Sequence, residues 1–184
     1  MAAVLRANAD GTPVTILETT FETYQPDRPA DLVVSAQAFH WVDPRLRYSK
    51  AASVLRPGGA LALLRNDKAD LDPDLHAELD RAYAEHLPQS RHRDASHVHA
   101  EITAEIDASA CFGPVEVRTA PWTESYSTAD YLRLLETYSD HAILDPSHKT
   151  PLHAAIAAAI DRRGGTITIP FVAALHLARV TPRG

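Results

Sequence analysis

The stretch that decides the fold covers residues 31–64 and reads DLVVSAQAFHWVDPRLRYSKAASVLRPGGALALL. It opens with a nearly continuous apolar run at 31–35, the pattern of a strand buried on both faces of a parallel sheet. Asp43, which a proline follows, predicts a helix N-terminus, and the sequence RPGG at 56–59 predicts the end of that helix. A second apolar run at 60–64 follows at once. Strand, helix and strand with short connections predict one βαβ crossover.

Similar patterns extend in both directions from this crossover. Upstream, residues 13–17 read as a strand that follows a short helical piece at 1–9. Downstream we predict four helices, with apolar faces around 75–86, 102–110, 131–138 and 152–160, and two strands, near 115–117 and 167–180. Ala173, Leu175 and Leu177 should share one side of the last strand, and Pro170 should place that strand at an edge or create a bulge. No repeat or linker interrupts residues 1–184, so we predict a single α/β domain.

Composition excludes several function classes. The chain has 184 residues, 45% of them hydrophobic, and 18 basic against 24 acidic side chains give a net charge of −6. Nucleic acids and anionic membrane surfaces are therefore unlikely partners, because phosphate binding needs a concentrated basic face. No apolar run reaches the ~20 residues of a membrane helix, and the N-terminus does not read as a signal peptide. The single cysteine, Cys111, reads as buried filler and fits a reducing cytoplasm.

Three stretches carry a family resemblance. The stretches are FETY at 21–24, the run 31–43 with its Ala-Gln-Ala-Phe-His-Trp, and VLRPGG at 54–59. Together and in this order, they resemble class I S-adenosylmethionine-dependent methyltransferases. They are most similar to the methyltransferase type 11 and trans-aconitate methyltransferase-like group, which has a His-Trp after its fourth strand. The resemblance implies a Rossmann-like sheet with a helical insertion before the last strand, and methyl transfer from S-adenosylmethionine to a small-molecule acceptor. Ligands of such open α/β sheets bind at the carboxyl ends of the strands.

The resemblance also implies which residues meet the cofactor. Thr20 and Phe21, just after the third strand of the family sheet, should border the adenine. The backbone of Ser35, Ala36 and Gln37, at the end of the fourth strand, should lie near the methionine part. Family members usually have an acidic side chain at the Thr20 position; a threonine accepts one hydrogen bond there but without the assistance of charge.

His40 and Trp41 should face the acceptor substrate. A neutral His40 imidazole could take a proton from an acceptor hydroxyl or carboxyl, which makes it the candidate catalytic residue. Methyl transfer from a sulfonium is an in-line displacement that mostly needs positioning, so it can proceed without a base. A strand-end tryptophan can also be present only for packing.

Two cofactor-binding features of the family are missing. The chain has 7 glycines, none in a Gly-x-Gly turn, and only Gly11 precedes the expected third strand. An acidic residue that ends the second strand and binds the ribose is also not found. We therefore expect an N-terminally truncated domain without its first two strands, with 1–66 a remnant of the cofactor-binding half and 67–184 the closing half.

The two missing strands would leave a gap of ~14 Å in the sheet, since neighbouring strands lie ~4.8 Å apart. Three outcomes are open: the third strand pairs beside the fourth, a partner fills the gap, or the recorded start is wrong. We favour the last. Cofactor binding by these 184 residues should then be weak or absent.

Other functions find less support. A group of side chains that can bind metals lies close together in the sequence: His92, Asp94, His97, His99 and Glu101. The residues around them read as a solvated connector, so we predict no metal site. A nucleotide-dependent oxidoreductase is disfavoured because no dinucleotide-binding fingerprint is present. The main alternative is a non-catalytic remnant that acts as a binding or dimerisation module through the exposed sheet edge.

Overall fold

A computed structural model describes residues 2–9, 11–87 and 95–181. Its elements are α1 (Ala2–Asn8), β1 (Ala30–Ala36), the short 3-10 helix η1 (Phe39–Trp41), α2 (Arg47–Val54), β2 (Leu55–Lys68), α3 (Pro73–His86), α4 (Ala95–Ala108), β3 (Glu116–Ser127), α5 (Thr128–Glu136), α6 (Ser139–Ala142), α7 (Pro146–Asp161) and β4 (Thr166–Arg179). None of the helices in this part of the chain is long and apolar enough to cross a membrane.

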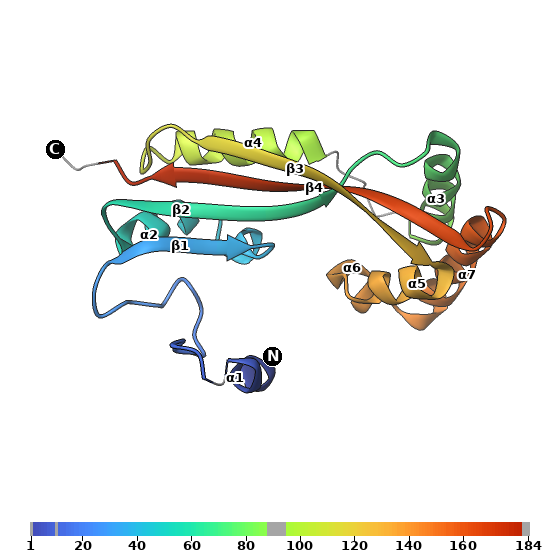
Figure 1. The fold of residues 1–184 in the computed structure, drawn as a ribbon, viewed down its shortest axis with the longest axis horizontal. Coiled ribbons are helices and arrows are strands. Elements are labelled where there is room, and N and C mark those ends of the chain that lie inside the picture. Colours follow the sequence, from blue (N-terminus) through green and yellow to red (C-terminus); the bar gives the residue numbers. More distant parts are fainter. Residues whose placement is uncertain (1, 10, 88–94, 182–184) are drawn as a thin grey trace. The chain divides into compact units, whose positions relative to one another are not determined.

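The strands form one sheet in the order β1-β2-β4-β3. The arrows of β1 and β2 run in the same direction in Figure 1, and that of β4 runs in the opposite direction. The α/β class, the βαβ crossover and the helical insertion before the last strand are confirmed, the insertion being α5 to α7. The strand order places β1 and β3 at the two edges.

The chain divides into two compact units, each of which is described by itself. Unit 1 contains residues 1–63, 106–115 and 177–184, and unit 2 contains residues 64–105 and 116–176. The division that the sequence suggests, at residues 66 and 67, stays a prediction. Both units draw on distant parts of the chain, because β2 and β4 contribute residues to each.

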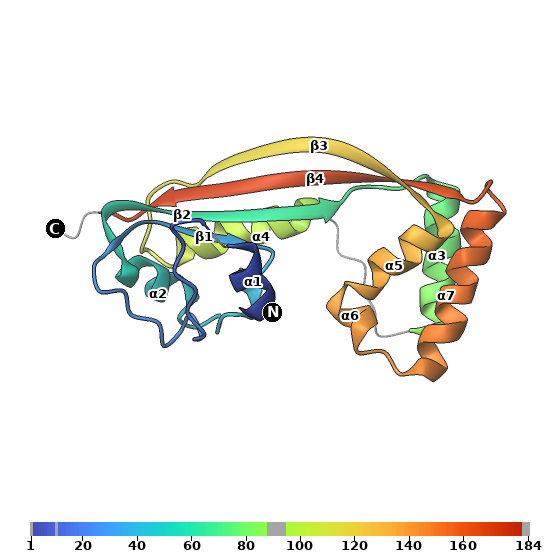
Figure 2. The ribbon, with the colours of Figure 1, turned by 60° about the horizontal axis from the view of Figure 1, so that its bottom comes forward.

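In unit 1, α2 begins later than the sequence predicts. The helix starts at Arg47, whereas Asp43 was the expected N-cap. The Asp43 carboxylate instead accepts hydrogen bonds from the Arg45 backbone N–H at 2.9 Å and from Arg45 Nη2 at 2.8 Å. These bonds hold the pKa of Asp43 at about 2 and stabilise a turn ahead of the helix. Figures 1 and 2 show α2 on one side of β1 and β2.

The prediction that β1 is buried on both faces is wrong. Leu32 is 49% exposed and Val34 is 53% exposed. An edge strand lacks a neighbour on one side, and no other described strand lies beyond β1 in the sheet. The apolar run therefore formed a strand, but its surroundings do not cover it.

The strand predicted at 13–17 is also wrong. Residues 14–18 have no regular secondary structure, and Val14 and Leu17 are exposed, at 61% and 59%. The outcome in which this segment pairs beside β1 is thus excluded. In the described part of the chain this segment pairs with no strand, not even along the open edge of β1, and strand propensity alone does not maintain an extended segment.

Close contact between β1 and β2 depends on Gly59. A methyl group at this position would lie 2.9 Å from the Arg56 carbonyl oxygen and 3.2 Å from those of Ala30 and Asp31. These atoms belong to backbone and cannot move aside as a flexible side chain does. The Gly-Gly pair that reads as a helix end therefore lies within β2 and permits the approach of β1.

Unit 2 contains a helical core built on α3, α5, α7 and the first half of β4. Its buried residues include Leu79, Leu135, Ile156 and Ile169. Asp72 caps α3 by accepting a hydrogen bond from the Leu75 N–H, and Ser127 caps α5 by accepting one from the Asp130 N–H. The apolar faces of three predicted helices meet in this core.

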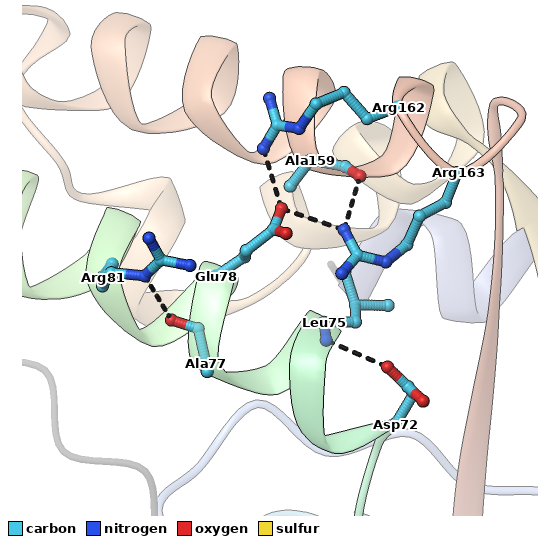
Figure 3. Close-up of polar contacts among 8 residues, drawn as sticks. All are labelled: Asp72, Leu75, Ala77, Glu78, Arg81, Ala159, Arg162 and Arg163. Atoms are coloured by element: carbon cyan, nitrogen blue, oxygen red, sulfur yellow. Dashed lines mark hydrogen bonds and ion pairs between the residues drawn. The ribbon is translucent and has the colours of Figure 1, made fainter.

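An ion-pair cluster fastens α3 to the end of α7. Glu78 accepts hydrogen bonds from Arg162 and Arg163, at 2.7 and 2.9 Å (Figure 3). Arg163 also donates to the Ala159 carbonyl at 3.3 Å. The two guanidinium groups lower the pKa of Glu78 to about 2, so this carboxylate stays charged at all ordinary pH values.

As predicted, Ala173, Leu175 and Leu177 share one side of β4, and of the two alternatives predicted for Pro170 the strand order excludes the edge position. The strand lies between β2 and β3, so Pro170 is not on an edge strand. Its fully buried side chains in the second half are Ala174, His176 and Ala178. The predicted set of Ala173, Leu175 and Leu177 forms the half-buried side. The buried face changes parity after Phe171, as expected if a bulge accommodates the proline.

The contacts of Gly59 yield a test. Gly59→Ala should lower the free energy of unfolding by about 1–3 kcal/mol, because the added methyl group overlaps backbone oxygens. Gly113→Ala is the matched control, since its methyl group would lie 3.8 Å from the Arg179 carbonyl, an ordinary contact. Urea unfolding measures both. Equal stability of the two variants would contradict the close approach.

Candidate functional site

The predicted site lies where β1 ends in unit 1. After Ala36 the chain turns at Gln37, whose φ of 53° is in the left-handed region that non-glycine residues rarely adopt. The one-turn helix η1 follows, and Val42 N donates to the Phe39 carbonyl at 3.2 Å. The strand thus ends at Ala36, and His40 and Trp41 lie in η1 just after the turn.

Residues 20–24 form a second turn. The Tyr24 N–H donates to the Thr20 carbonyl at 3.0 Å. The hydroxyl groups of Thr20 and Thr23 are hydrogen-bonded to each other at 3.0 Å, and that of Thr23 also lies 3.0 Å from Thr19 Oγ1. The turn is therefore held by its own threonine side chains and not by a sheet.

Two contacts bring this turn to the end of β1. The ring centroids of Phe21 and Phe39 lie 6.4 Å apart, and Phe39 lies 5.3 Å from Tyr48 of α2. The Glu22 carboxylate accepts a hydrogen bond from the Asp43 N–H at 3.2 Å. The two stretches to which the resemblance assigns the adenine and the acceptor are thus adjacent in the folded chain.

The candidate residues differ in exposure. Phe21 and Ser35 are half-buried, whereas Thr20, Ala36, Gln37 and His40 are exposed. Trp41 is 69% exposed, and its ring lies 4.9 Å from that of His40. An exposed pair of aromatic rings is a surface on which a planar ligand can stack.

The fit to S-adenosylmethionine is partial. The Phe21 ring and the exposed backbone of Ala36 and Gln37 suit an adenine and a methionine moiety. Of the described residues that precede Thr20, Glu18 carries the one acidic side chain, and it pairs with Arg6 at 2.6 Å. The described residues before Thr20 therefore supply no unpaired carboxylate for the ribose hydroxyls.

Sequence reasoning missed the roles of Glu22 and Phe39. Backbone hydrogen bonds at Glu22 itself and from Asp43 lower the pKa of Glu22, so its carboxylate is charged and engaged. No local pattern marks such a contact, because Glu22 and Asp43 are 21 positions apart. The sequence signal that could have indicated this contact is the position of Glu22, an acidic residue beside a turn within the FETY motif.

Residues considered for other chemistry are dispersed. His92 and Asp94, and the side chain of His97, lie outside the described residues. The ring of His99 lies 5.3 Å from that of His176, and no group of three or more metal-binding side chains occurs in the described ranges. Cys111 is half-buried, and its Sγ lies 3.3 Å from the Ser109 carbonyl.

The Glu22 contact can be tested by amide hydrogen exchange. In Glu22→Ala the Asp43 N–H loses its acceptor, and its exchange should accelerate about fivefold or more. Glu22→Gln keeps an oxygen acceptor and should change the exchange much less. If both variants leave the Asp43 amide protected, another group holds the turn in place.

Comparisons with known proteins identify one family and several relatives that this chain resembles. Residues 1–63 match the family described as Methyltransferase domain. Over 68 residues the chain is 46% identical to uncharacterized methyltransferases of Mycobacterium tuberculosis and Mycobacterium bovis. This match covers 37% of the chain but only 28% of each of these relatives.

Solved structures show the same fold across most of the chain. A candidate Type II methyltransferase from Anaeromyxobacter dehalogenans superimposes with a TM-score of 0.56 at 23% identity, over 86% of this chain and 68% of that one. A candidate methyltransferase from Bacillus halodurans gives a TM-score of 0.54 at 17% identity, over 98% and 78%. The family match at 1–63, the curated relatives and the shared fold together confirm the resemblance of this chain to class I S-adenosylmethionine-dependent methyltransferases.

Proposed function

We propose that this chain contributes to methyl transfer from S-adenosylmethionine to a small-molecule acceptor. The carrying observation is that the turn at 20–24 and the segment after β1 are joined by the Phe21–Phe39 and Glu22–Asp43 contacts. In an open α/β sheet this strand end is the position at which ligands bind. The matched stretch at 1–63 contains both segments.

In this proposal the cofactor lies along residues of unit 1. Thr20 and the Phe21 ring border the adenine, and the backbone of Ser35, Ala36 and Gln37 contacts the methionine part. The left-handed Gln37 supports this role, because strained backbone positions concentrate at ligand-binding sites. The bound cofactor would supply an activated methyl group on its sulfonium.

His40 and Trp41 would receive the acceptor. Trp41 offers an exposed aromatic face, and His40 beside it can accept a proton from an acceptor hydroxyl or carboxyl at neutral pH. Orientation of the acceptor in line with the methyl group provides most of the rate. His40 therefore acts as the proposed catalytic residue only if the acceptor carries a proton that must leave.

The compartment and partners are proposed on composition. A net charge of −6 disfavours nucleic acid, and a single cysteine suits the cytoplasm. We also propose that residues 1–66 form the cofactor-binding part and that 67–184 form the closing part.

Calorimetric titration with S-adenosylhomocysteine tests the cofactor site. We expect weak binding by the unmodified chain and about tenfold tighter binding by Thr20→Asp, because a carboxylate makes a charge-assisted hydrogen bond to the adenine amino group. Thr150→Asp adds the same charge at an exposed position of α7 and should leave the affinity unchanged. No heat from either the unmodified chain or Thr20→Asp at millimolar ligand would remove this proposal.

A second candidate function is a dimerisation module. The observation that favours it is the edge position of β1 together with the exposed side chains of Leu32 and Val34. An uncovered apolar edge strand is a template for pairing with another strand. A second copy of β1 would complete the sheet across a twofold axis.

Light scattering across a range of protein concentrations tests this module. The unmodified chain should show a mass that rises toward that of a dimer, and Val34→Lys should shift this rise to at least about tenfold higher concentration, since an edge lysine opposes strand pairing. Val14→Lys is the control, because Val14 is equally exposed but lies outside any strand. A constant monomer mass for the unmodified chain would contradict dimerisation.

A further inference from the structure

We propose that the cluster around Lys68 in unit 2 is a binding site for a small organic carboxylate. Lys68 is the last residue of β2, and its Nζ donates a hydrogen bond to Tyr131 Oη at 3.1 Å. The same Nζ lies 5.2 Å from the ring centroid of Tyr131 and 4.9 Å from that of Tyr138. The ammonium group is therefore held against two phenol rings.

Among the described residues, this ammonium group has no carboxylate counter-ion. Across the described ranges no carboxylate oxygen lies within ion-pair distance of Lys68 Nζ, and Asp140 of α6 acts on it only at longer range. Lys149, by contrast, pairs with Glu136 at 3.1 Å. An ammonium has three N–H donors, and the contacts of Lys68 include one oxygen acceptor. Burial lowers the pKa of Lys68 to about 8, which is the expected cost of an unpaired charge in this environment.

The surrounding side chains are neutral and polar. Tyr83 Oη lies 2.9 Å from His141 Nε2, and His141 Nδ1 lies 3.2 Å from His153 Nε2. Burial raises the pKa of Tyr83 and of Tyr131, and burial lowers the pKa of both histidines. At neutral pH these groups carry no charge, so they neither neutralise the ammonium nor add to it.

These features select the chemical class of the ligand. One ammonium and nearby phenol hydroxyls match a single carboxylate, which accepts several hydrogen bonds and carries one negative charge. A phosphate dianion would need further cations. The half-buried rings of Tyr138 and Tyr126 provide an apolar surface for the body of the ligand, whereas the ring of Tyr131, 6.3 Å from that of Tyr126, is buried in the core beneath them. A carboxylate joined to a small aromatic or aliphatic group fits both requirements.

Carboxylate binding by this cluster goes beyond the methyl transfer proposed for unit 1 and does not depend on it. Carboxylate binding by unit 2 can be measured without S-adenosylmethionine. The two proposals can therefore fail separately.

The experiment uses the small number of lysines. The chain contains three, Lys50, Lys68 and Lys149, so a protein labelled with 13C-lysine gives three Cε–Hε resonances that single variants assign. Sodium benzoate is the probe. Saturating benzoate should raise the apparent pKa of Lys68 by about one unit or more, since a neighbouring anion favours the charged amine. Lys149 and Lys50 should titrate as they do without benzoate.

Two matched variants measure the contribution of the charge. Lys68→Met should weaken benzoate binding about tenfold or more, whereas Lys149→Met, which also removes one positive charge, should leave it unchanged. Circular dichroism confirms that each variant is folded. Tyr131→Phe keeps the ring but removes the hydroxyl group, and should weaken binding by a smaller factor, about threefold to tenfold.

Three results would overturn the site. The first is a Lys68 resonance that millimolar benzoate does not move, and the second is equal loss of binding in Lys68→Met and Lys149→Met. The third is movement of Lys68 with inorganic phosphate but not with benzoate, which would exclude a carboxylate as the ligand. Benzoate binding in the absence of any S-adenosylhomocysteine binding would support this site and contradict only the proposed methyl transfer.

Discussion

The pairing of β1 with β2 is the constraint on which the candidate site depends. Gly59 makes it possible, because only hydrogen fits where the Arg56, Ala30 and Asp31 carbonyl oxygens converge. The pairing fixes where β1 ends, and this position sets the left-handed turn at Gln37 and the one-turn helix after it. The positions of the candidate residues from Ser35 to Trp41 therefore depend on the pairing of β1 with β2 and on the turn that follows β1.

The opposite wall of the site is held in a different way. Residues 20–24 have no strand to support them, so ring contacts, the Glu22–Asp43 bond and a hydrogen bond from Lys50 Nζ to the Tyr24 carbonyl take over the role that a hydrogen-bond ladder would have. These contacts are few and only part-buried, and segments held by few buried contacts open easily. The same lack of a neighbouring strand leaves the apolar side chains of β1 uncovered. The proposed weak cofactor binding and the proposed edge pairing would therefore have a common physical origin.

Two charged side chains of unit 2, Glu78 and Lys68, differ in their surroundings. Glu78 on α3 is held by two guanidinium groups that join α3 to the end of α7 (Figure 3). Lys68 has no such partner among the described residues and is surrounded by neutral phenols and imidazoles. The first arrangement is complete without a ligand, whereas the second improves when an anion is added. This difference separates a structural ion pair from a proposed binding site.

Local sequence determined the elements whose stability is local. The caps at Asp72 and Ser127, the helix ending before Gly164 and Gly165, and the βαβ crossover were all predictable, because their signals lie within a few residues of the structure that they specify. The motif at 31–43 likewise predicted the family resemblance, which the match at 1–63 supports, whereas the position of the candidate site stays a prediction.

Only the tertiary structure decided which of these elements are covered and which distant groups meet. The apolar run at 13–17 is not a strand and β1 is not buried, because both outcomes depend on neighbouring strands. Glu22 meets Asp43, and Lys68 meets Tyr131, across 21 and 63 positions of the chain. Burial and long-range contact are properties of the packed chain, and no periodicity in a sequence window encodes them.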